Sequence, residues 1–177
     1  MKDRIDSPLL ITVLGPTGAQ GSPVIAQLLA AGHRVRAAAR DPLRIRARWG
    51  DQVEAVAVNL DDPESVTAAL AGVDAAFLHL PLPASPTEAI ANASGLIRGL
   101  ARSTLPLAVY TSSGFGIEAM PDVSIVAAGR QVIAGLRATG RPLIVLRPTI
   151  YVENLHWPDS VARIREQGIL DYPSLLR

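Results

Sequence analysis

The chain has 177 residues, a formal net charge of +1, 49% hydrophobic and 4% aromatic residues, and no cysteine. These values predict one domain with a core of small aliphatic residues, argue against a polybasic nucleic-acid surface, and exclude disulfides and thiolate chemistry. No apolar run reaches the roughly 18 residues that a membrane span needs, and the start of the chain, MKDRIDSPLL, lacks a signal-peptide core. We therefore expect a soluble, cytoplasmic protein without a membrane or nucleic-acid partner.

Short apolar runs alternate with helical patterns along the chain. Strands are predicted at residues 9–15, 34–40, 53–60, 73–80, 106–113 and 141–149, and helices at 22–33, 41–50, 62–72, 86–103, 124–139 and 157–167. Continuous apolar runs are typical of strands buried on both faces, and right-handed crossovers make such strands parallel. The pattern predicts an α/β fold: a doubly wound parallel sheet, the Rossmann architecture, with six strands in the order 3-2-1-4-5-6 and helices on both faces.

Three glycines at three-residue spacing, Gly15, Gly18 and Gly21, separate the first strand from the first helix. Glycine weakens the interior of helices and strands, so this cluster indicates unusual backbone angles or a ligand held close to the backbone. In a doubly wound sheet, the free amides and positive dipole end at this turn bind a dinucleotide pyrophosphate. The Thr17 hydroxyl and the Gln20 amide offer further polar contacts. The sequence favours a nucleotide cradle over an empty turn.

Arg40 ends the second predicted strand, with Asp41 directly after it and Arg44 one helical turn further. At this place, about 20 residues after the glycines, an acidic residue binds ribose hydroxyls in NAD sites and an arginine accommodates the 2′-phosphate of NADP. A guanidinium suits a phosphate because it donates paired, charge-assisted hydrogen bonds. The sequence favours NADP over NAD. Two alternatives stay open, which are a ribose contact by Asp41 and arginines that are only solvated surface charges.

Five stretches carry a family resemblance: ITVLGPTGAQG (11–21), ARDP (39–42), VNLDDPESVTAALAGVDAAF (58–77), VYTSS (109–113) and RPTIYVENL (147–155). Together they resemble the NmrA-like group of atypical short-chain dehydrogenases/reductases, over residues 9–173. The resemblance implies one NAD(P)-binding Rossmann domain over residues 1–177, with residues 151–177 as the remnant of a substrate-side region. It implies cofactor contacts at the glycines and at the strand ends, namely Gly15, Thr17, Gly18, Ala19, Gln20, Gly21, Arg40, Asn59, Leu60, His79, Leu80, Pro81, Ser112, Pro148 and Thr149.

The resemblance also implies a part of the cofactor for each group of residues. Arg40 would bind the 2′-phosphate, and Asn59 and Leu60 would lie against the adenine. Residues 79–81 would line the side of the nicotinamide ribose, while residues 148–149 and 153–154 would border the nicotinamide end. Asn59 departs from the family pattern, which usually has an acidic residue there.

The catalytic groups of the resembled family are missing. Short-chain dehydrogenases use a tyrosine activated by a lysine four residues later, but the only lysine of this chain is Lys2. The positions at which many NmrA-like relatives have a lysine and a glutamate hold Gly129 and Ile133. The catalytic residue is therefore unknown, and the candidates that remain are Ser112, Tyr110 and His79. No cluster of His, Asp or Glu has metal-ligand spacing, so no metal is expected.

Two functions remain open. The first is an NADPH-dependent oxidoreductase that reduces quinones or imines, in which the nicotinamide supplies the hydride and the protein orients it. The alternative is a non-catalytic NADP(H)-binding redox sensor that acts on a regulatory partner. Chains of the resembled group are usually longer, so we expect a fragment or a pocket completed by another subunit. An uncovered apolar patch would then favour a homo-oligomer. The substrate and the protein partner stay unknown.

Overall fold

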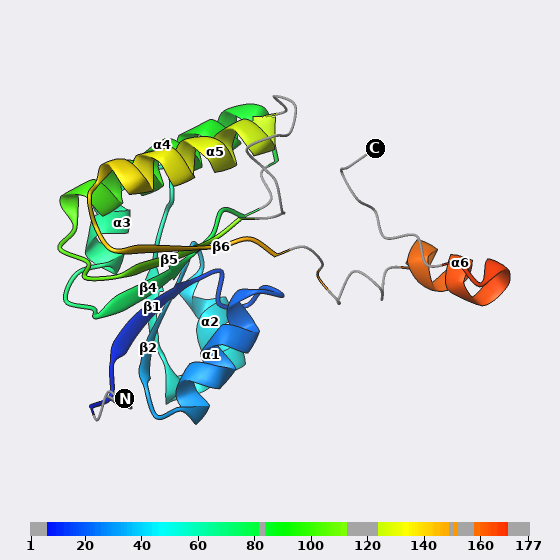
Figure 1. The fold of residues 1–177 in the computed structure, drawn as a ribbon. Helices are drawn as coiled ribbons and strands as arrows, with labels where there is room; N and C mark the ends of the chain where they lie inside the picture. Colours follow the sequence, from blue (N-terminus) through cyan, green and yellow to red (C-terminus); the bar gives the residue numbers. More distant parts are fainter. Residues whose placement is uncertain (1–6, 82–83, 113–123, 149–150, 152–157, 170–177) are drawn as a thin grey trace, which may run out of the picture. The chain divides into compact units, whose positions relative to one another are not determined.

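We analysed a computed structural model, which describes residues 7–81, 84–112, 124–148, 151 and 158–169 (Figure 1). The chain divides into two compact units, residues 1–147 and 148–177. The first unit holds every strand described below. Within the second unit, the described secondary structure is a single helix, α6 (Pro158–Gln167).

The first unit alternates strands and helices. Its elements are β1 (Leu10–Leu14), α1 (Gly21–Ala30), β2 (Arg34–Ala39), α2 (Pro42–Trp49), the 3-10 helix η1 (Gly50–Gln52), β3 (Glu54–Ala57), α3 (Pro63–Ala69), β4 (Ala75–Leu78), α4 (Pro86–Arg102), β5 (Ala108–Thr111), α5 (Ser124–Ala138) and β6 (Leu143–Leu146). The six strands form one sheet in the order β3-β2-β1-β4-β5-β6, and each neighbouring pair is parallel. The predicted doubly wound sheet and its strand order are confirmed.

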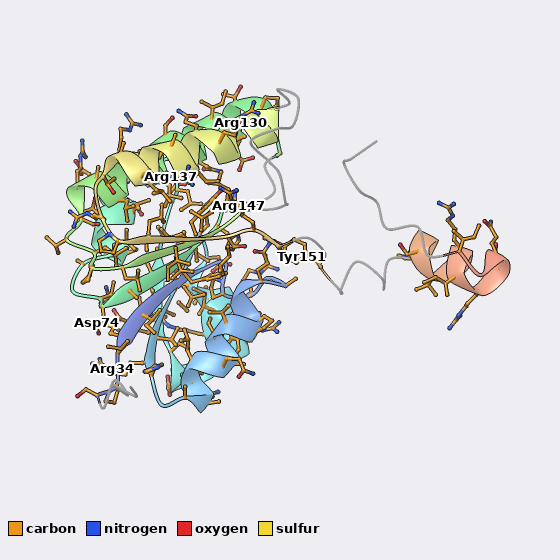
Figure 2. The ribbon with its side chains drawn as sticks, in the orientation of Figure 1. Arg34, Asp74, Arg130, Arg137, Arg147 and Tyr151 are labelled. Carbon is orange, nitrogen blue, oxygen red and sulfur yellow. The ribbon has the colours of Figure 1, made fainter. Side chains whose placement is uncertain are left out.

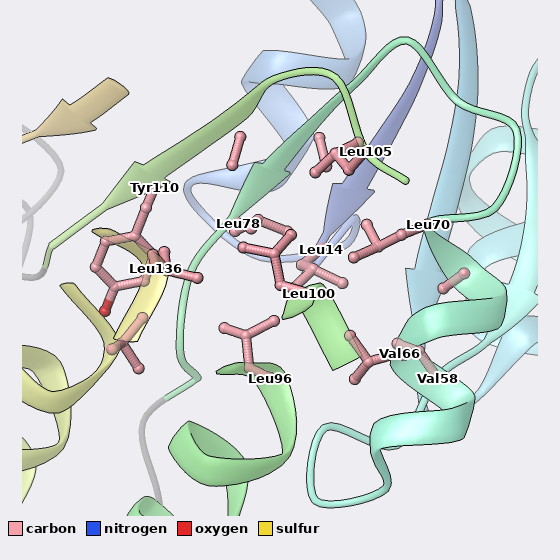
Figure 3. Packing of buried hydrophobic residues seen from close by; sticks show 14 of the residues in the cluster. Leu14, Val58, Val66, Leu70, Leu78, Leu96, Leu100, Leu105, Tyr110 and Leu136 are labelled. Carbon is pink, nitrogen blue, oxygen red and sulfur yellow. The ribbon is translucent and has the colours of Figure 1, made fainter. Parts of the chain in front are cut away.

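Helices cover both faces of this sheet: α1 and α2 lie on one face, and α3, α4 and α5 lie on the other (Figure 1). Side chains alternate along a strand, so Val13 joins the core beside α1 and α2 whereas Leu14 joins the larger core beside α3 to α5. Figure 3 shows this larger core, in which Leu78, Leu100 and Tyr110 are almost fully buried. Burial on both faces explains why the strands read as continuous apolar runs.

The amino-terminal ends of the central strands are tied together. The Asp74 carboxylate, just before β4, accepts a hydrogen bond from the Leu10 amide at 2.7 Å, and the Arg34 amide donates to the Leu9 carbonyl at 2.8 Å. Figure 2 shows Arg34 and Asp74 at the same end of the sheet. The strands therefore start in register, and their carboxyl ends reach the opposite edge together.

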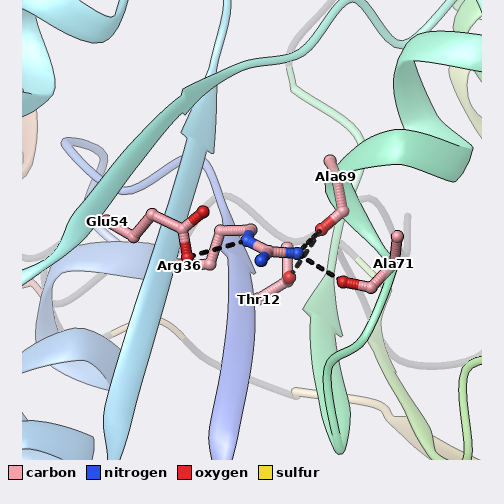
Figure 4. Close-up of polar contacts among 5 residues, drawn as sticks. All are labelled: Thr12, Arg36, Glu54, Ala69 and Ala71. Atoms are coloured by element: carbon pink, nitrogen blue, oxygen red, sulfur yellow. Dashed lines mark hydrogen bonds and ion pairs between the residues drawn. The ribbon is translucent and has the colours of Figure 1, made fainter.

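Arg36 links β2 to β3 and to the end of α3 (Figure 4). Its Nε lies 3.0 Å from a Glu54 carboxylate oxygen of β3, and its Nη1 donates to the carbonyls of Ala69 and Ala71 at 3.4 and 2.6 Å. The Thr12 hydroxyl of β1 donates to the same Ala69 carbonyl at 2.8 Å. A cation at the carboxyl end of α3 stabilises the helix dipole. Arg36 is therefore a structural residue.

Polar side chains begin three of the helices. The Asp41 carboxylate accepts from the Leu43 amide at the start of α2, at 2.9 Å, and Asp62 does the same at the start of α3. The Ser85 hydroxyl accepts from the Glu88 amide at the start of α4, at 3.1 Å. No helix among the described residues is long and apolar enough to cross a membrane.

Candidate functional site

A hollow of about 330 Å³ opens at the carboxyl ends of β1, β2 and β4. We call it the glycine-turn hollow, and its lining residues are Leu14, Gly15, Thr17, Gly18, Ala38, Ala39, Arg40, Asp41, Arg44, Val58, Leu60, His79 and Pro81. Seven of the predicted cofactor residues therefore meet here, although they come from four separate parts of the sequence. A second and more open hollow lies beside α5 and β6, where Arg137 and Arg147 line it (Figure 2), and it contains none of the predicted site residues.

Two of the three glycines in the turn at residues 15–21, the glycine turn, are required by the protein itself. Gly15 has φ of +62°, and a Cβ on it would overlap the His79 ring, with Cε1 only 2.8 Å away. A Cβ on Gly21 would lie 2.8 Å from the Gly15 carbonyl carbon and 2.9 Å from the Leu14 carbonyl oxygen. Any larger residue at these positions would push the turn away from β1 and β4.

Gly18 is different. Its φ is not positive, and a Cβ on it would meet one neighbour within 4 Å, the Gly15 carbonyl oxygen at 3.4 Å. That distance is an ordinary contact. The fold would therefore accept a methyl group at Gly18, so neither its backbone angles nor its packing explains the glycine there.

Four hydrogen bonds hold the glycine turn, and their donors belong to the turn itself, to α1 and to α2. The Gly18 amide donates to the Gly15 carbonyl at 3.0 Å, and the Ser22 amide donates to the Gly18 carbonyl at 3.1 Å. The Pro16 carbonyl accepts from the Ser22 hydroxyl at 3.1 Å and from Trp49 Nε1 at 2.9 Å. Sequence reasoning missed Trp49, because it lies 33 residues from Pro16 and no local pattern connects the two.

The start of α1 lacks the side-chain cap that α2, α3 and α4 have. Gln20 occupies the N-cap position with helical backbone angles and accepts no capping hydrogen bond. The first turn of a helix has amides without intrahelical partners. These donors and the positive dipole end favour an anion at this place.

His79 follows β4 and lies against the glycine turn. Its Nδ1 is 3.2 Å from the Leu80 carbonyl oxygen, while its Nε2 is buried and has no hydrogen-bond partner. Burial lowers the pKa of the imidazole below its usual 6.5, and the carbonyls of Leu80 and Leu14 offset part of this effect. The ring is therefore neutral near pH 7, with one buried polar nitrogen beside the hollow.

Arg40 and Asp41 follow β2, and their side chains have different surroundings. The Arg40 side chain is 81% exposed, and its nearest carboxylate, that of Glu88, is 3.9 Å away. Such an exposed and long ion pair leaves the guanidinium available for another anion. One oxygen of the Asp41 carboxylate accepts the capping hydrogen bond of α2, which leaves the other oxygen for a ribose hydroxyl. Arg44 lies exposed on the first turn of α2 and lines the same hollow.

Several predicted residues lie outside the lining of this hollow. Tyr110 and Ser112 are 2% and 0% exposed, and the Ser112 hydroxyl donates to the Leu146 carbonyl at 3.3 Å. Gly129 and Ile133, at the positions of the family's lysine and glutamate, are also buried. Ala19, Asn59 and Leu80 adjoin lining residues in the sequence, whereas Gln20 and Gly21 are two and three residues from Gly18. Pro148 belongs to the second unit, and Thr149 and residues 153–154 are outside the described residues.

Among the described residues, no group of three or more His, Asp or Glu side chains could hold a metal ion. The polar groups of the glycine-turn hollow are instead the hydroxyl of Thr17, the guanidinium groups of Arg40 and Arg44, the carboxylate of Asp41 and the ring of His79. The hydroxyl and the two guanidinium groups can donate hydrogen bonds, whereas Nε2 of the neutral His79 ring accepts, because its Nδ1–H faces the Leu80 carbonyl. The hollow thus suits a ligand with several acceptor oxygens.

The lowered pKa of His79 predicts a loss of stability in acid. Below the usual pKa of 6.5 the unfolded chain binds a proton that the folded protein resists, so the free energy of unfolding falls as the pH falls. His79→Gln removes this titration. Denaturant unfolding at about pH 7.5 and pH 5 should show a larger acid loss for the parent than for the variant. Parallel pH profiles for the two proteins would show that burial does not perturb His79.

Comparison with known proteins places these features in a family. The NmrA-like family matches residues 8–170. The chain is 33% identical over 167 residues to the (4-alkanoyl-5-oxo-2,5-dihydrofuran-3-yl)methyl phosphate reductase of Streptomyces griseus, with 91% of this chain and 54% of that protein covered. It therefore spans about half the length of the curated relative.

Solved structures share the fold. The Citrobacter sp. triphenylmethane reductase complexed with NADP(H) superposes with a TM-score of 0.70 at 24% identity, covering 81% of this chain and 50% of that one. The Escherichia coli quinone oxidoreductase QOR2 complexed with NADPH gives 0.72 at 20% identity, covering 88% and 52%. At these identities the likeness establishes the architecture alone, whereas the match over residues 8–170 is a family match. The chain is a member of the NmrA-like family.

Proposed function

We propose that the chain binds NADP(H) in the glycine-turn hollow and is the cofactor-binding part of an NADPH-dependent reductase. The observation that carries this proposal is Gly18. The fold would accept a methyl group there, yet the residue is glycine at the rim of the hollow. A ligand that lies directly on the backbone explains the missing side chain, and at the start of a helix that ligand is a phosphate group.

The surroundings of Gly18 support a pyrophosphate. The uncapped start of α1 offers the amides of Gln20 and Gly21, because the Ser22 amide already donates within the turn. The Thr17 hydroxyl lines the hollow, and His79 has a buried Nε2 without a hydrogen-bond partner. A buried polar atom costs free energy until it is paired. Phosphate oxygens could accept from the amides and the hydroxyl, whereas Nε2 of the neutral ring, whose Nδ1–H faces the Leu80 carbonyl, could accept from a ligand hydroxyl.

The remainder of the hollow fits the adenosine end of the same ligand. Ala38, Ala39, Val58 and Leu60 give it an apolar lining that suits a flat base. Arg40 and Arg44 stand at its outer rim, where a 2′-phosphate on the adenosine ribose would bind two guanidinium groups. We therefore assign NADP(H) as the preferred cofactor, with NAD(H) as the weaker ligand.

Bound NADPH would supply a hydride from its nicotinamide. The chain's own residues would bind and orient the cofactor, because the sequence lacks the tyrosine–lysine pair for proton transfer. The named relatives act on an unsaturated oxofuran phosphate, quinones and triphenylmethane dyes. These are conjugated acceptors that stabilise the added electron pair themselves, and we propose an acceptor of that kind for the full-length protein.

A non-catalytic NADP(H) sensor is the second candidate, and the burial of Tyr110 and Ser112 favours it. The sensor would bind NADPH without consuming it. Oxidation of NADPH, followed at 340 nm with a panel of quinones and simple ketones, separates the two functions. We expect turnover with quinones and negligible turnover with ketones. NADPH that binds but is not oxidised by any acceptor would favour the sensor.

Gly18→Ala should separate the fold from the binding of NADPH. The methyl group has room in the protein but would occupy the space of the pyrophosphate. We expect an unchanged melting temperature and at least a tenfold loss of NADPH affinity by titration calorimetry, the equivalent of about 1.4 kcal/mol. Unchanged affinity in the folded variant would contradict the cradle.

Arg40→Ala should remove most of the preference for NADPH over NADH. Hydrogen bonds to charged groups contribute roughly 1.5 to 3 kcal/mol, so the preference should be on the order of tenfold to a hundredfold. It should shrink as salt rises, because the guanidinium is exposed. Arg46→Ala is the matched control, since Arg46 is an exposed arginine of α2 that does not line the hollow. Equal affinities of the parent for NADPH and NADH would contradict the contact between Arg40 and the 2′-phosphate. They would favour the alternative in which Asp41 binds the ribose hydroxyls.

A further inference from the structure

Trp49, the last residue of α2, reaches across to the glycine turn. Its ring packs against the smaller core cluster, and its Nε1 donates to the Pro16 carbonyl at 2.9 Å. The Ser22 hydroxyl donates to the same oxygen at 3.1 Å. Two donors from different helices therefore fix the direction of one peptide carbonyl in the turn.

That carbonyl determines where the next amide points. A trans peptide is planar, so the carbonyl of Pro16 and the amide N–H of Thr17 point in opposite directions. Pro16 is buried and its carbonyl faces Trp49 and Ser22, whereas Thr17 is exposed and lines the glycine-turn hollow. Within the described part of the chain, the Thr17 amide donates no backbone hydrogen bond. It is thus held toward the hollow and free to donate to a ligand.

The two arginines that would bind the 2′-phosphate lie at the start of the same helix. Arg44 lies in the first turn of α2, and Arg40 directly precedes the capping residue Asp41. The far end of α2 holds the glycine turn through Trp49. One helix therefore links the two places at which a dinucleotide with a 2′-phosphate carries negative charge.

We propose that Trp49 is a positioning residue for cofactor binding: it aims the Thr17 amide at the pyrophosphate and fixes the glycine turn relative to Arg40 and Arg44. This inference rests on the proposed function. It differs from a role in core packing alone, because the indole N–H, and not the ring, carries the effect.

Trp49→Phe tests this distinction, since phenylalanine keeps an aromatic ring in the core and removes the N–H donor. NADPH, NADH and 2′-AMP are titrated against the parent and the variant. The first two carry the pyrophosphate, whereas 2′-AMP carries the phosphate that Arg40 and Arg44 would bind. We expect a loss of about threefold to tenfold for both dinucleotides and no change for 2′-AMP. Ser22→Ala, which removes the other donor to Pro16, should give the same selective pattern.

Other outcomes overturn the inference. An equal loss of affinity for all three ligands would mean that the ring only supports the fold. Unchanged dinucleotide affinities in both variants would mean that the two hydrogen bonds to the Pro16 carbonyl do not affect cofactor binding. In either case the parent would still bind NADPH, and the proposed function would stand. A parent protein that binds neither dinucleotide would overturn the proposed function together with this inference.

Discussion

The close approach of backbone to backbone at the glycine turn is the constraint on which the site depends. Gly21 packs against the Gly15 carbonyl, and Gly15 packs against the His79 ring, without room for a side chain at either glycine. These contacts bring the start of α1 and the end of β4 to the carboxyl end of β1. The parallel register of β1 with β2 and β4 then places Arg40 and His79 on either side of the turn. The hollow results from this arrangement of the backbone. Of the three glycines, only Gly18 is not explained by the fold, and the proposed ligand would explain it.

The architecture could be predicted from the sequence because each of its causes is local. Strands buried on both faces need continuous apolar residues, and Asp41, Asp62 and Ser85 mark the helices that they cap. The contacts of Arg36 with Glu54 and Ala71, and of Trp49 with Pro16, could not be predicted. They join residues far apart in the chain, and any exposed arginine or core tryptophan would produce the same local pattern.

Part of the candidate site could also be predicted from the sequence. The glycines, Arg40 and His79 follow strand ends at the carboxyl edge, so the topology alone brings them together. Tyr110 also lies near a strand end, yet it belongs to the core (Figure 3). In a sheet that is covered on both faces, alternation does not tell which side chain reaches the edge. The cap that the Asp41 carboxylate gives α2 is by contrast a local feature, because an aspartate followed by a proline is typical of a helix start.

The proposed function requires that this chain binds the phosphates of NADPH. Phosphorus-31 NMR observes the pyrophosphate and the 2′-phosphate of one NADPH molecule as separate signals, while unmodified protein is added. The account predicts that both signals shift or broaden together and reach their limit at one protein per NADPH. A shift of the 2′-phosphate alone would show an arginine contact without a cradle at the glycine turn. Signals that stay unchanged at an excess of protein would contradict the account as a whole.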